Sequence, residues 1–263
     1  MVDRALYLAR IGYRRSVVPS AETLRGLHLA HVLTVPFENL DIHLGRPISL
    51  EPAAIFEKIV GRCRGGYCYE LNGLFALLLE QLGFVVTRLA ARVWYGAESR
   101  GPRSHQVLLV HLDGERWIVD VGFGGNGLRE PLQLTVGQEH RQGPDQFRLT
   151  TDERGEYMLQ CCLENAWTNL YSFTLDPCLP VDYQFANYYH SHAPDSQFVQ
   201  RHICTMPTPQ GRKTFTGKLL KVRGQDGTHE LHVTSERECK QLLQQHFGVI
   251  INDHLRFLSV DGE

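Results

Sequence analysis

The longest helical pattern in this chain follows residue 68. Apolar residues recur there at three- and four-residue steps, which places them on one face of a helix. These positions are Leu71, Leu74, Phe75, Leu78 and Leu82. Gly83 comes directly after the last of them and is typical of a helix C-terminus. The spacing therefore predicts an amphipathic helix that ends at Gly83.

Two further helices are predicted before it. Ser20 can cap one of them and Ser49 the other, because a serine side chain accepts a hydrogen bond from a free N–H of the first turn. Residues 35–39, VPFEN, interrupt the helical pattern and are expected to form a loop that exposes Phe37. Residues 1–83 are thus predicted to form a helical segment.

From residue 84 onward the pattern changes to short runs of β-branched and aromatic residues, separated by Gly, Pro and Asp. Six strands are expected, at residues 84–95, 105–112, 115–121, 147–151, 157–163 and 168–174. Successive strands with short turns favour an antiparallel sheet or small barrel. Two prolines near residue 180 indicate the end of this segment.

The remaining chain is expected to contain strands at 215–222 and 229–233 and one helix. Ser235 and Glu238 have the spacing of a capping box at the start of that helix. The predicted fold class is α+β. Its three segments are 1–83, 84–180 and 181–263.

Composition narrows the functional classes. A net charge of -2 over 263 residues gives no basic field, so nucleic acid is not the expected partner. The chain has no apolar run long enough for a membrane span, and charges interrupt its first residues as they would not in a secretory signal. Seven cysteines without a framework spacing suit a reducing compartment, so a cytoplasmic location is expected.

Cys68 lies at the start of the predicted amphipathic helix, after two glycines that allow a sharp bend. Free N–H groups at a helix N-terminus favour a thiolate, which is the reactive form of cysteine. Glu70 opposes this with a second negative charge, and Arg62 or Arg64 could neutralise it. The alternative interpretation is a small buried cysteine with a purely structural role. The residues that contact Cys68 must decide between the two.

A histidine and an aspartate are predicted to meet in the next segment. Asp113 and Gly114 form a strong two-residue hairpin signal, and with that turn Val107 faces Asp120. His105 lies two residues from Val107 on the same face, which makes it a diagonal neighbour of Asp120. The pair could be an ordinary cross-strand contact. An aspartate within an apolar strand nevertheless needs a partner, because a buried unpaired charge is costly.

Cys68, His105 and Asp120 in this order would be a nucleophile, its base and an orienting carboxylate. The corresponding reaction class is acyl transfer through a thioester. The glycine-rich stretch 122–127 follows Asp120 and could bring backbone N–H groups close to a ligand, or could simply be a flexible exit from the strand.

The chain resembles the arylamine N-acetyltransferases. The motif RGGYCYELNG at 64–73 carries the resemblance. Further matches in the same order are VPFEN at 35–39, SHQ at 104–106, VDVGFG at 119–124, NYYHSHAPDSQF at 187–198 and TPQG at 208–211. The chain looks compact and lacks the large insertion of the family's vertebrate members.

The resemblance implies a helical bundle, a β-barrel and an α/β lid around a cysteine-protease-like Cys-His-Asp core. It implies that acetyl passes from acetyl-CoA to the cysteine and then to an arylamine, an arylhydrazine or an N-arylhydroxylamine. Cys68 would be the nucleophile, His105 the base and Asp120 the orienting residue. Phe37, Val93 and Phe123 would line the acceptor pocket, and Gly124, Gly125 and Thr208 would contact CoA. No metal is implied.

Four alternatives remain at this point. A cysteine peptidase or transglutaminase-like enzyme would use the same triad without CoA. An amide synthase within the same family would use another acyl donor. A metal-binding module could use Cys63, Cys68, His190 and His192, although the spacing lacks the paired cysteines of structural zinc sites. A plain globular interaction protein would make the triad pattern a coincidence.

Overall fold

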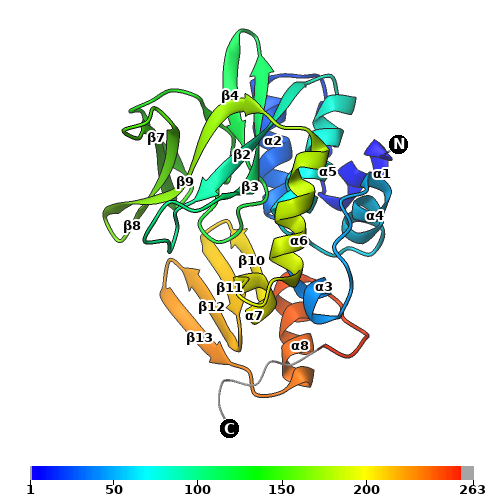
Figure 1. Ribbon diagram of the computed structural model, residues 1–263. Coiled ribbons are helices and arrows are strands. Elements are labelled where there is room, and N and C mark those ends of the chain that lie inside the picture. Colours follow the sequence, from blue (N-terminus) through cyan, green and yellow to red (C-terminus); the bar gives the residue numbers. More distant parts are fainter. Residues whose placement is uncertain (1, 256–263) are drawn as a thin grey trace.

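The computed structural model describes residues 2–255. Its N-terminal helices surround α5, Cys68–Gln81, which is the longest of them (Figure 1). The others are α1, Arg4–Arg10; α2, Ala21–Val32; α3, Leu40–His43; α4, Pro52–Phe56; and the π-helical turn η1, Glu57–Gly61. The amphipathic helix predicted after residue 68 is confirmed, and Leu71, Leu74 and Leu78 of its apolar face are fully buried.

The first of the two earlier helices is also confirmed, because the Ser20 hydroxyl accepts a hydrogen bond from the N–H of Thr23 at 3.1 Å. The predicted cap of the second helix is wrong. That helix begins at Pro52 rather than after Ser49, since proline suits the first helical position, where no N–H is needed. Its last turn widens into the π-helical η1.

Eight strands form one antiparallel sheet in the order β5-β4-β3-β2-β9-β8-β7-β6. They are β2, Val85–Val93; β3, Arg103–Leu112; β4, Glu115–Val119; β5, Leu132–Gln133; β6, Glu139–Gln142; β7, Asp145–Thr151; β8, Tyr157–Leu163; and β9, Ala166–Pro177. Val136, just beyond β5, bridges to Leu149 in β7 and so brings the two ends of the sheet together. The result is the predicted barrel, nearly closed (Figure 1).

Strand β3 is buried on both faces. Val107 and Leu109 point into the barrel, whereas Leu108 and Val110 pack against the helices. The predicted hairpin register is also correct, since Leu112 pairs with Glu115 across the turn. This register sets the face on which the next polar side chains lie.

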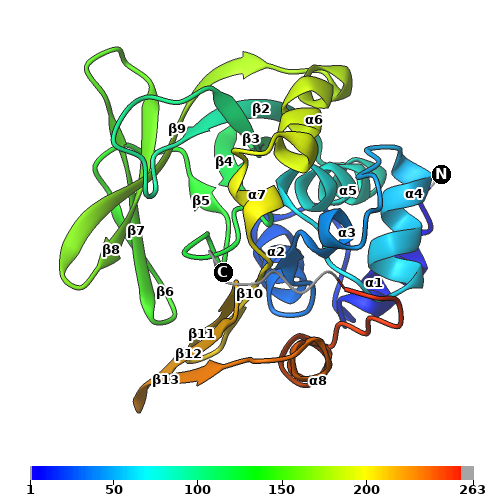
Figure 2. The same ribbon diagram turned by 60° about the horizontal axis from the view of Figure 1, so that its bottom comes forward.

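A second sheet, the C-terminal sheet, contains β1, Phe37–Glu38; β10, Ile203–Thr208; β11, Gly211–Thr216; β12, Leu219–Gly224; and β13, Gly227–His232. Helix α8, Glu236–Phe247, lies beside it (Figure 2). The single strand predicted at 215–222 is wrong. A turn at Gly217, with a φ of +61°, divides it into β11 and β12.

Of the two hydrogen bonds of the capping box predicted at the start of α8, one is present. Ser235 accepts from the N–H of Glu238 at 3.2 Å, but the Glu238 carboxylate bonds to the N–H of Thr234 rather than to that of Ser235.

The loop predicted at 35–39 is wrong at its centre. Phe37 pairs with Thr205 of β10 and is only 7% exposed, so it belongs to the C-terminal sheet.

Three short helical elements before β10 were not predicted. They are the 3₁₀ turn η2, Pro180–Tyr183; α6, Gln184–His192; and α7, Gln197–Gln200. Their apolar residues do not form a buried stripe that helical spacing could reveal; Phe185, for example, is 89% exposed.

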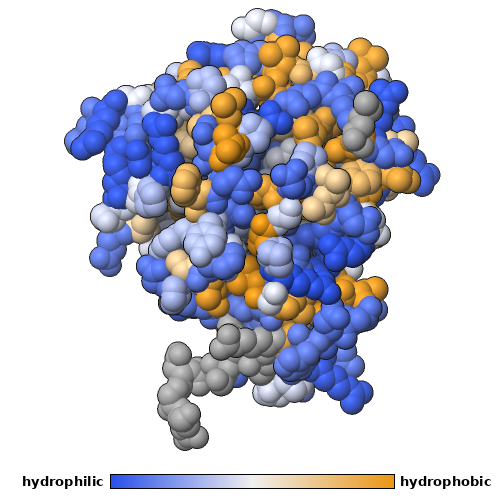
Figure 3. Space-filling view, turned by 45° about the vertical axis from the view of Figure 1, so that its right-hand side comes forward, coloured by the Kyte–Doolittle hydropathy of each residue, from blue (hydrophilic) through white to orange (hydrophobic). Residues whose placement is uncertain are grey.

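Figure 3 shows that hydrophobic and hydrophilic groups intermingle on one face of the molecule. The segment boundaries at 83 and 180 stay a prediction, and residues 256–263 of the third segment lie outside the described residues.

Candidate active site

Cys68 is the first residue of α5 and is only 4% exposed. The turn before it can hold no larger residue than glycine, because a Cβ on Gly65 would lie 2.0 Å from the carbonyl oxygen of Pro36. The Glu70 carboxylate accepts from the N–H of Tyr67 at 3.0 Å and so fixes the start of the helix. The thiol is therefore held at a helix N-terminus by a tightly packed turn.

A buried charge network lies behind this turn. It consists of Glu38, Asp41, Lys58, Arg64 and Glu70. Lys58 contacts Glu70 at 2.8 Å, whereas Arg64 contacts Glu38 at 2.8 Å. The predicted neutralisation of Glu70 by an arginine is thus wrong, since the lysine does it. Burial lowers the pKa of Lys58, but its carboxylate neighbours outweigh burial and raise that pKa above the usual value.

His105 and Asp120 meet as the hairpin register predicts. The Nε2 atom of His105 lies 2.8 Å from Oδ2 of Asp120, and both side chains are buried. The other carboxylate oxygen accepts from the side-chain amide of Asn72 at 2.8 Å and from the N–H of Gly122 at 2.9 Å. Asn72 comes from α5, one turn after Cys68, so the helix that carries the thiol also orients the carboxylate.

The electrostatics of this pair follow from its surroundings. Burial alone lowers the pKa of His105, but Asp120 and then Cys68 outweigh it and raise the pKa to about 10. Burial raises the pKa of Asp120, and His105 and Asn72 outweigh it and lower that pKa. Cys68 acts on His105 partly through a hydrogen bond, which leaves Nδ1 as the ring nitrogen that faces the thiol. Cys68 and His105 can therefore exchange a proton, while the Asp120 carboxylate orients the ring and stabilises its charged form.

Two more residues contact the His105–Asp120 pair and were missed in the sequence. The N–H of Asp120 donates to Nε2 of His28 at 3.3 Å, and Nδ1 of His28 lies 2.9 Å from the carbonyl oxygen of Arg129. Burial lowers the pKa of His28 to about 4, so its ring is neutral. The ring of Tyr171 lies 5.1 Å from that of His105. Helical and strand periodicity carries no signal for such long-range contacts.

Cys68 and His105 open into a cleft of about 800 Å³ between the barrel and the C-terminal sheet. The predicted pocket residues Phe37, Val93 and Phe123 all line it. Of the predicted CoA contacts, Gly125 lines the same cleft, and Gly124 lines a small adjoining cavity. The structure thus brings together the triad, the three pocket residues and one glycine.

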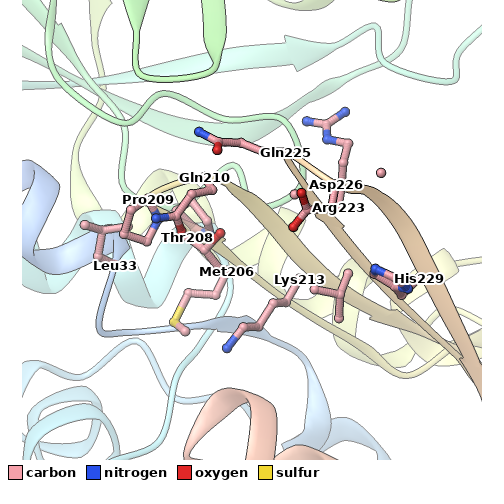
Figure 4. Close-up of a pocket in the computed structure, with 14 residues that line it drawn as sticks. Leu33, Met206, Thr208, Pro209, Gln210, Lys213, Arg223, Gln225, Asp226 and His229 are labelled. Atoms are coloured by element: carbon pink, nitrogen blue, oxygen red, sulfur yellow. The ribbon is translucent and has the colours of Figure 1, made fainter.

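Thr208 lies elsewhere. It lines a separate pocket of about 680 Å³ together with Met206 and Lys213 (Figure 4). Side chains alternate between the faces of a strand, and Thr205 of the same strand lines the cleft. Thr208 therefore points to the opposite face of the C-terminal sheet from Cys68.

The cleft wall on the C-terminal sheet was not predicted. Its cationic side chains are Arg212, Lys221 and Arg223, which alternate with residues on the other face. Period-two alternation in β12 could have indicated them, but the sequence does not say which face meets the cleft. His190 and Phe198 also line it.

Among residues 2–255, no group of three or more metal-ligating side chains could hold an ion, so the metal-binding alternative has no supporting geometry. All seven cysteines are free. No helix in the described part of the chain is long and apolar enough to cross a membrane.

Comparison with known proteins shows the family of this chain. The family profile described as N-acetyltransferase matches residues 20–256. The arylamine N-acetyltransferase / N-hydroxyarylamine O-acetyltransferase of Salmonella typhimurium is 37% identical over 250 residues, which cover 94% of this chain and 89% of the relative. The chain belongs to the arylamine N-acetyltransferase family.

Solved structures of arylamine N-acetyltransferases share the fold. The enzyme from M. tuberculosis matches with a TM-score of 0.89 at 36% identity and covers 94% of this chain and 93% of its own. The Mycobacterium marinum enzyme in complex with CoA matches with a TM-score of 0.88 at 33% identity, with the same coverage. The predicted family and the predicted α+β fold class are therefore confirmed, and membership of this family makes the chain an acyltransferase.

Proposed function

We propose that this protein transfers acetyl from acetyl-CoA to arylamines, arylhydrazines or N-arylhydroxylamines through a thioester on Cys68. The observation that carries the proposal is the contact of His105 with both Cys68 and Asp120 beside the start of α5, where Cys68 and His105 line one cleft. A thiol, a histidine and a carboxylate in this order form an activated nucleophile. The names of the relatives support the donor and acceptor classes.

Before the first half-reaction, the thiol proton of Cys68 already lies on Nδ1 of His105, so that a thiolate faces an imidazolium. The thiolate attacks the acetyl carbonyl carbon, an Sγ–C bond forms, and the bond from that carbon to the CoA sulfur breaks. His105 returns the proton to the departing CoA thiolate. Asp120 keeps Nε2–H directed at its carboxylate and stabilises the imidazolium, which accounts for the raised pKa of His105.

In the second half-reaction, the acceptor nitrogen or oxygen attacks the thioester carbon. An N–C or O–C bond forms, the Sγ–C bond breaks, and His105 takes the acceptor proton and keeps it opposite the Cys68 thiolate. Thioesters acylate amines readily, provided that water is kept out. The aromatic rings of Phe37 and Phe123 suit a flat aryl acceptor by stacking.

The donor would lie along the C-terminal sheet. Phosphates need cationic partners, and the half-exposed side chains of Lys221 and Arg223 supply them on the cleft wall, whereas Arg212 is buried against Asp145. Gly125 would allow the donor to approach the backbone closely. We also propose a cytoplasmic location, because the seven free cysteines suit a reducing compartment.

Intact mass spectrometry tests the proposal directly. The protein is mixed with acetyl-CoA without an amine, beside a Cys68→Ala variant. We expect the wild type to gain one acetyl group and to lose it when an arylamine is added, while the variant gains none. Absence of the adduct together with no release of CoA in the presence of amines would contradict the proposal and would direct attention to peptides and other acyl donors.

A further inference from the structure

His190 lies in the cleft but has no part in the proton transfers described above. It belongs to α6 and lines the cleft together with Cys68 and His105. Its Nε2 atom lies 3.0 Å from the carbonyl oxygen of Ser104, the residue before His105. A carbonyl oxygen can only accept a hydrogen bond, so Nε2 carries the hydrogen.

The other ring nitrogen is therefore an acceptor whenever the ring is neutral. Burial lowers the pKa of His190, and the nearby His105 lowers it further, although the Ser104 carbonyl raises it. The ring is neutral at pH 7, and Nδ1 carries a lone pair. One hydrogen bond thus fixes the tautomer of this histidine.

Nδ1 of His190 has no hydrogen-bond partner within residues 2–255 and is not sealed from solvent. The ring is flanked by aromatic side chains, with Phe198 in a T-shaped contact at 5.1 Å and Tyr69 at 6.1 Å. His192, two residues further along α6, differs: its Nδ1 contacts Ser191, and it does not line the cleft. His190 is thus a fixed acceptor in an otherwise aromatic wall.

We propose that Nδ1 of His190 accepts a hydrogen bond from the acyl acceptor and favours acceptors with an N–H next to the reacting atom. This inference rests on the proposed function. An arylhydrazine that reacts at its terminal nitrogen keeps an N–H on the inner nitrogen, and an N-arylhydroxylamine that reacts at oxygen keeps one on nitrogen. A simple arylamine has a ring carbon at that position. The acetyl group of the donor has no such hydrogen.

The test compares three acceptors that differ in this hydrogen. Phenylhydrazine carries it, 1-methyl-1-phenylhydrazine has a methyl group in its place, and aniline has neither. We expect His190→Phe to lower kcat/KM for phenylhydrazine by about three- to tenfold, as for the loss of one neutral hydrogen bond, and to change the other two little. The rate of Cys68 acetylation by acetyl-CoA should be unchanged.

Two further variants complete the design. His190→Gln can still donate to Ser104 and offers an amide oxygen to the cleft, so it should retain part of the preference for phenylhydrazine. His192→Phe, on the same helix but outside the cleft, should behave as the wild type. Melting temperatures show whether the variants fold.

Equal losses with all three acceptors, or slower acetylation of Cys68, would overturn the inference, because His190 would then act on His105 through Ser104. A phenylhydrazine preference in His190→Gln no greater than that in His190→Phe would also overturn it. Failure of the proposed function is distinguishable, since in that case the wild type itself would not gain an acetyl group on Cys68.

Discussion

The two sides of the cleft differ in how many of their charged side chains are paired within the protein. Behind Cys68, the buried charge network pairs two cations with three carboxylates, and Lys58 and Arg64 are 3% and 4% exposed. Across the cleft, every residue of β13 is exposed, and among residues 2–255 the Arg223 side chain makes one ion pair, a long one at 3.4 Å with Asp145. The buried charge network holds the nucleophile in place before any substrate binds, whereas the C-terminal sheet leaves charged side chains available to a substrate.

The largest effect is expected from a substitution in the His105–Asp120 pair, which lies on the side of the cleft that holds the nucleophile. Asp120→Asn keeps the shape of the side chain but removes its charge, so His105 loses both its orientation and the stabilisation of its imidazolium. We expect kcat to fall by about 10³-fold or more. Steady-state kinetics with an arylamine measure it. Asp113→Asn, in the exposed hairpin turn, is the control and should retain full activity; a similar kcat for Asp120→Asn and the wild type would contradict the assigned role.

The next effect concerns stability. Lys58→Met leaves buried carboxylates without their cation, which costs about 3–5 kcal/mol of the free energy of unfolding. Denaturant unfolding measures it. Lys240→Met removes a cation from a pair with Glu236 at the surface, so a much smaller change is expected there. Equal losses in both variants would show that the buried charge network has no special role.

The pH dependence of stability provides a third test. The pKa of His105 is raised from about 6.5 in the unfolded chain to about 10 in the folded protein. A raised pKa stabilises the folded state fully below pH 6.5, and this contribution is lost as pH rises through 10. The free energy of unfolding of the wild type, relative to His105→Gln, should therefore shrink between pH 6.5 and pH 10. A constant difference over that range would contradict a charged His105–Asp120 pair in the resting protein.

The smallest effect is expected on the open side. Arg223→Gln should raise KM for acetyl-CoA about threefold, with little change in kcat or melting temperature, because a partly exposed charge contributes little. The difference from the wild type should fade as salt is added. Arg154→Gln, in an exposed turn between β7 and β8, is the matched control. An unchanged KM would place the donor phosphates elsewhere.

Much of this arrangement was accessible from the sequence. Helix α5 follows from its apolar spacing, and the meeting of His105 with Asp120 follows from a two-residue turn and its register. Both are local patterns, in which the positions of neighbouring residues settle the geometry. The family motifs supplied the remaining pocket residues.

The incorrect predictions share a physical cause. Phe37 was assigned to an exposed loop because its strand partner, Thr205, lies far away in the sequence. The sequence carries no sign that Lys58 would reach Glu70, nor of which face of the C-terminal sheet meets the cleft. The CoA contact of Thr208 stays a prediction. Long-range pairing and the choice of sheet face depend on tertiary packing, which periodicity does not encode.

Strand β1 determines when, during synthesis of the protein, the site becomes complete. Its two residues face different sites: Phe37 lines the cleft, whereas Glu38 belongs to the buried charge network. Both are held by β10, so neither the acceptor pocket nor the support of the thiol is complete until residues 203–208 have left the ribosome. A nascent chain that already displays Cys68 therefore lacks a complete site until β10 has folded back onto β1.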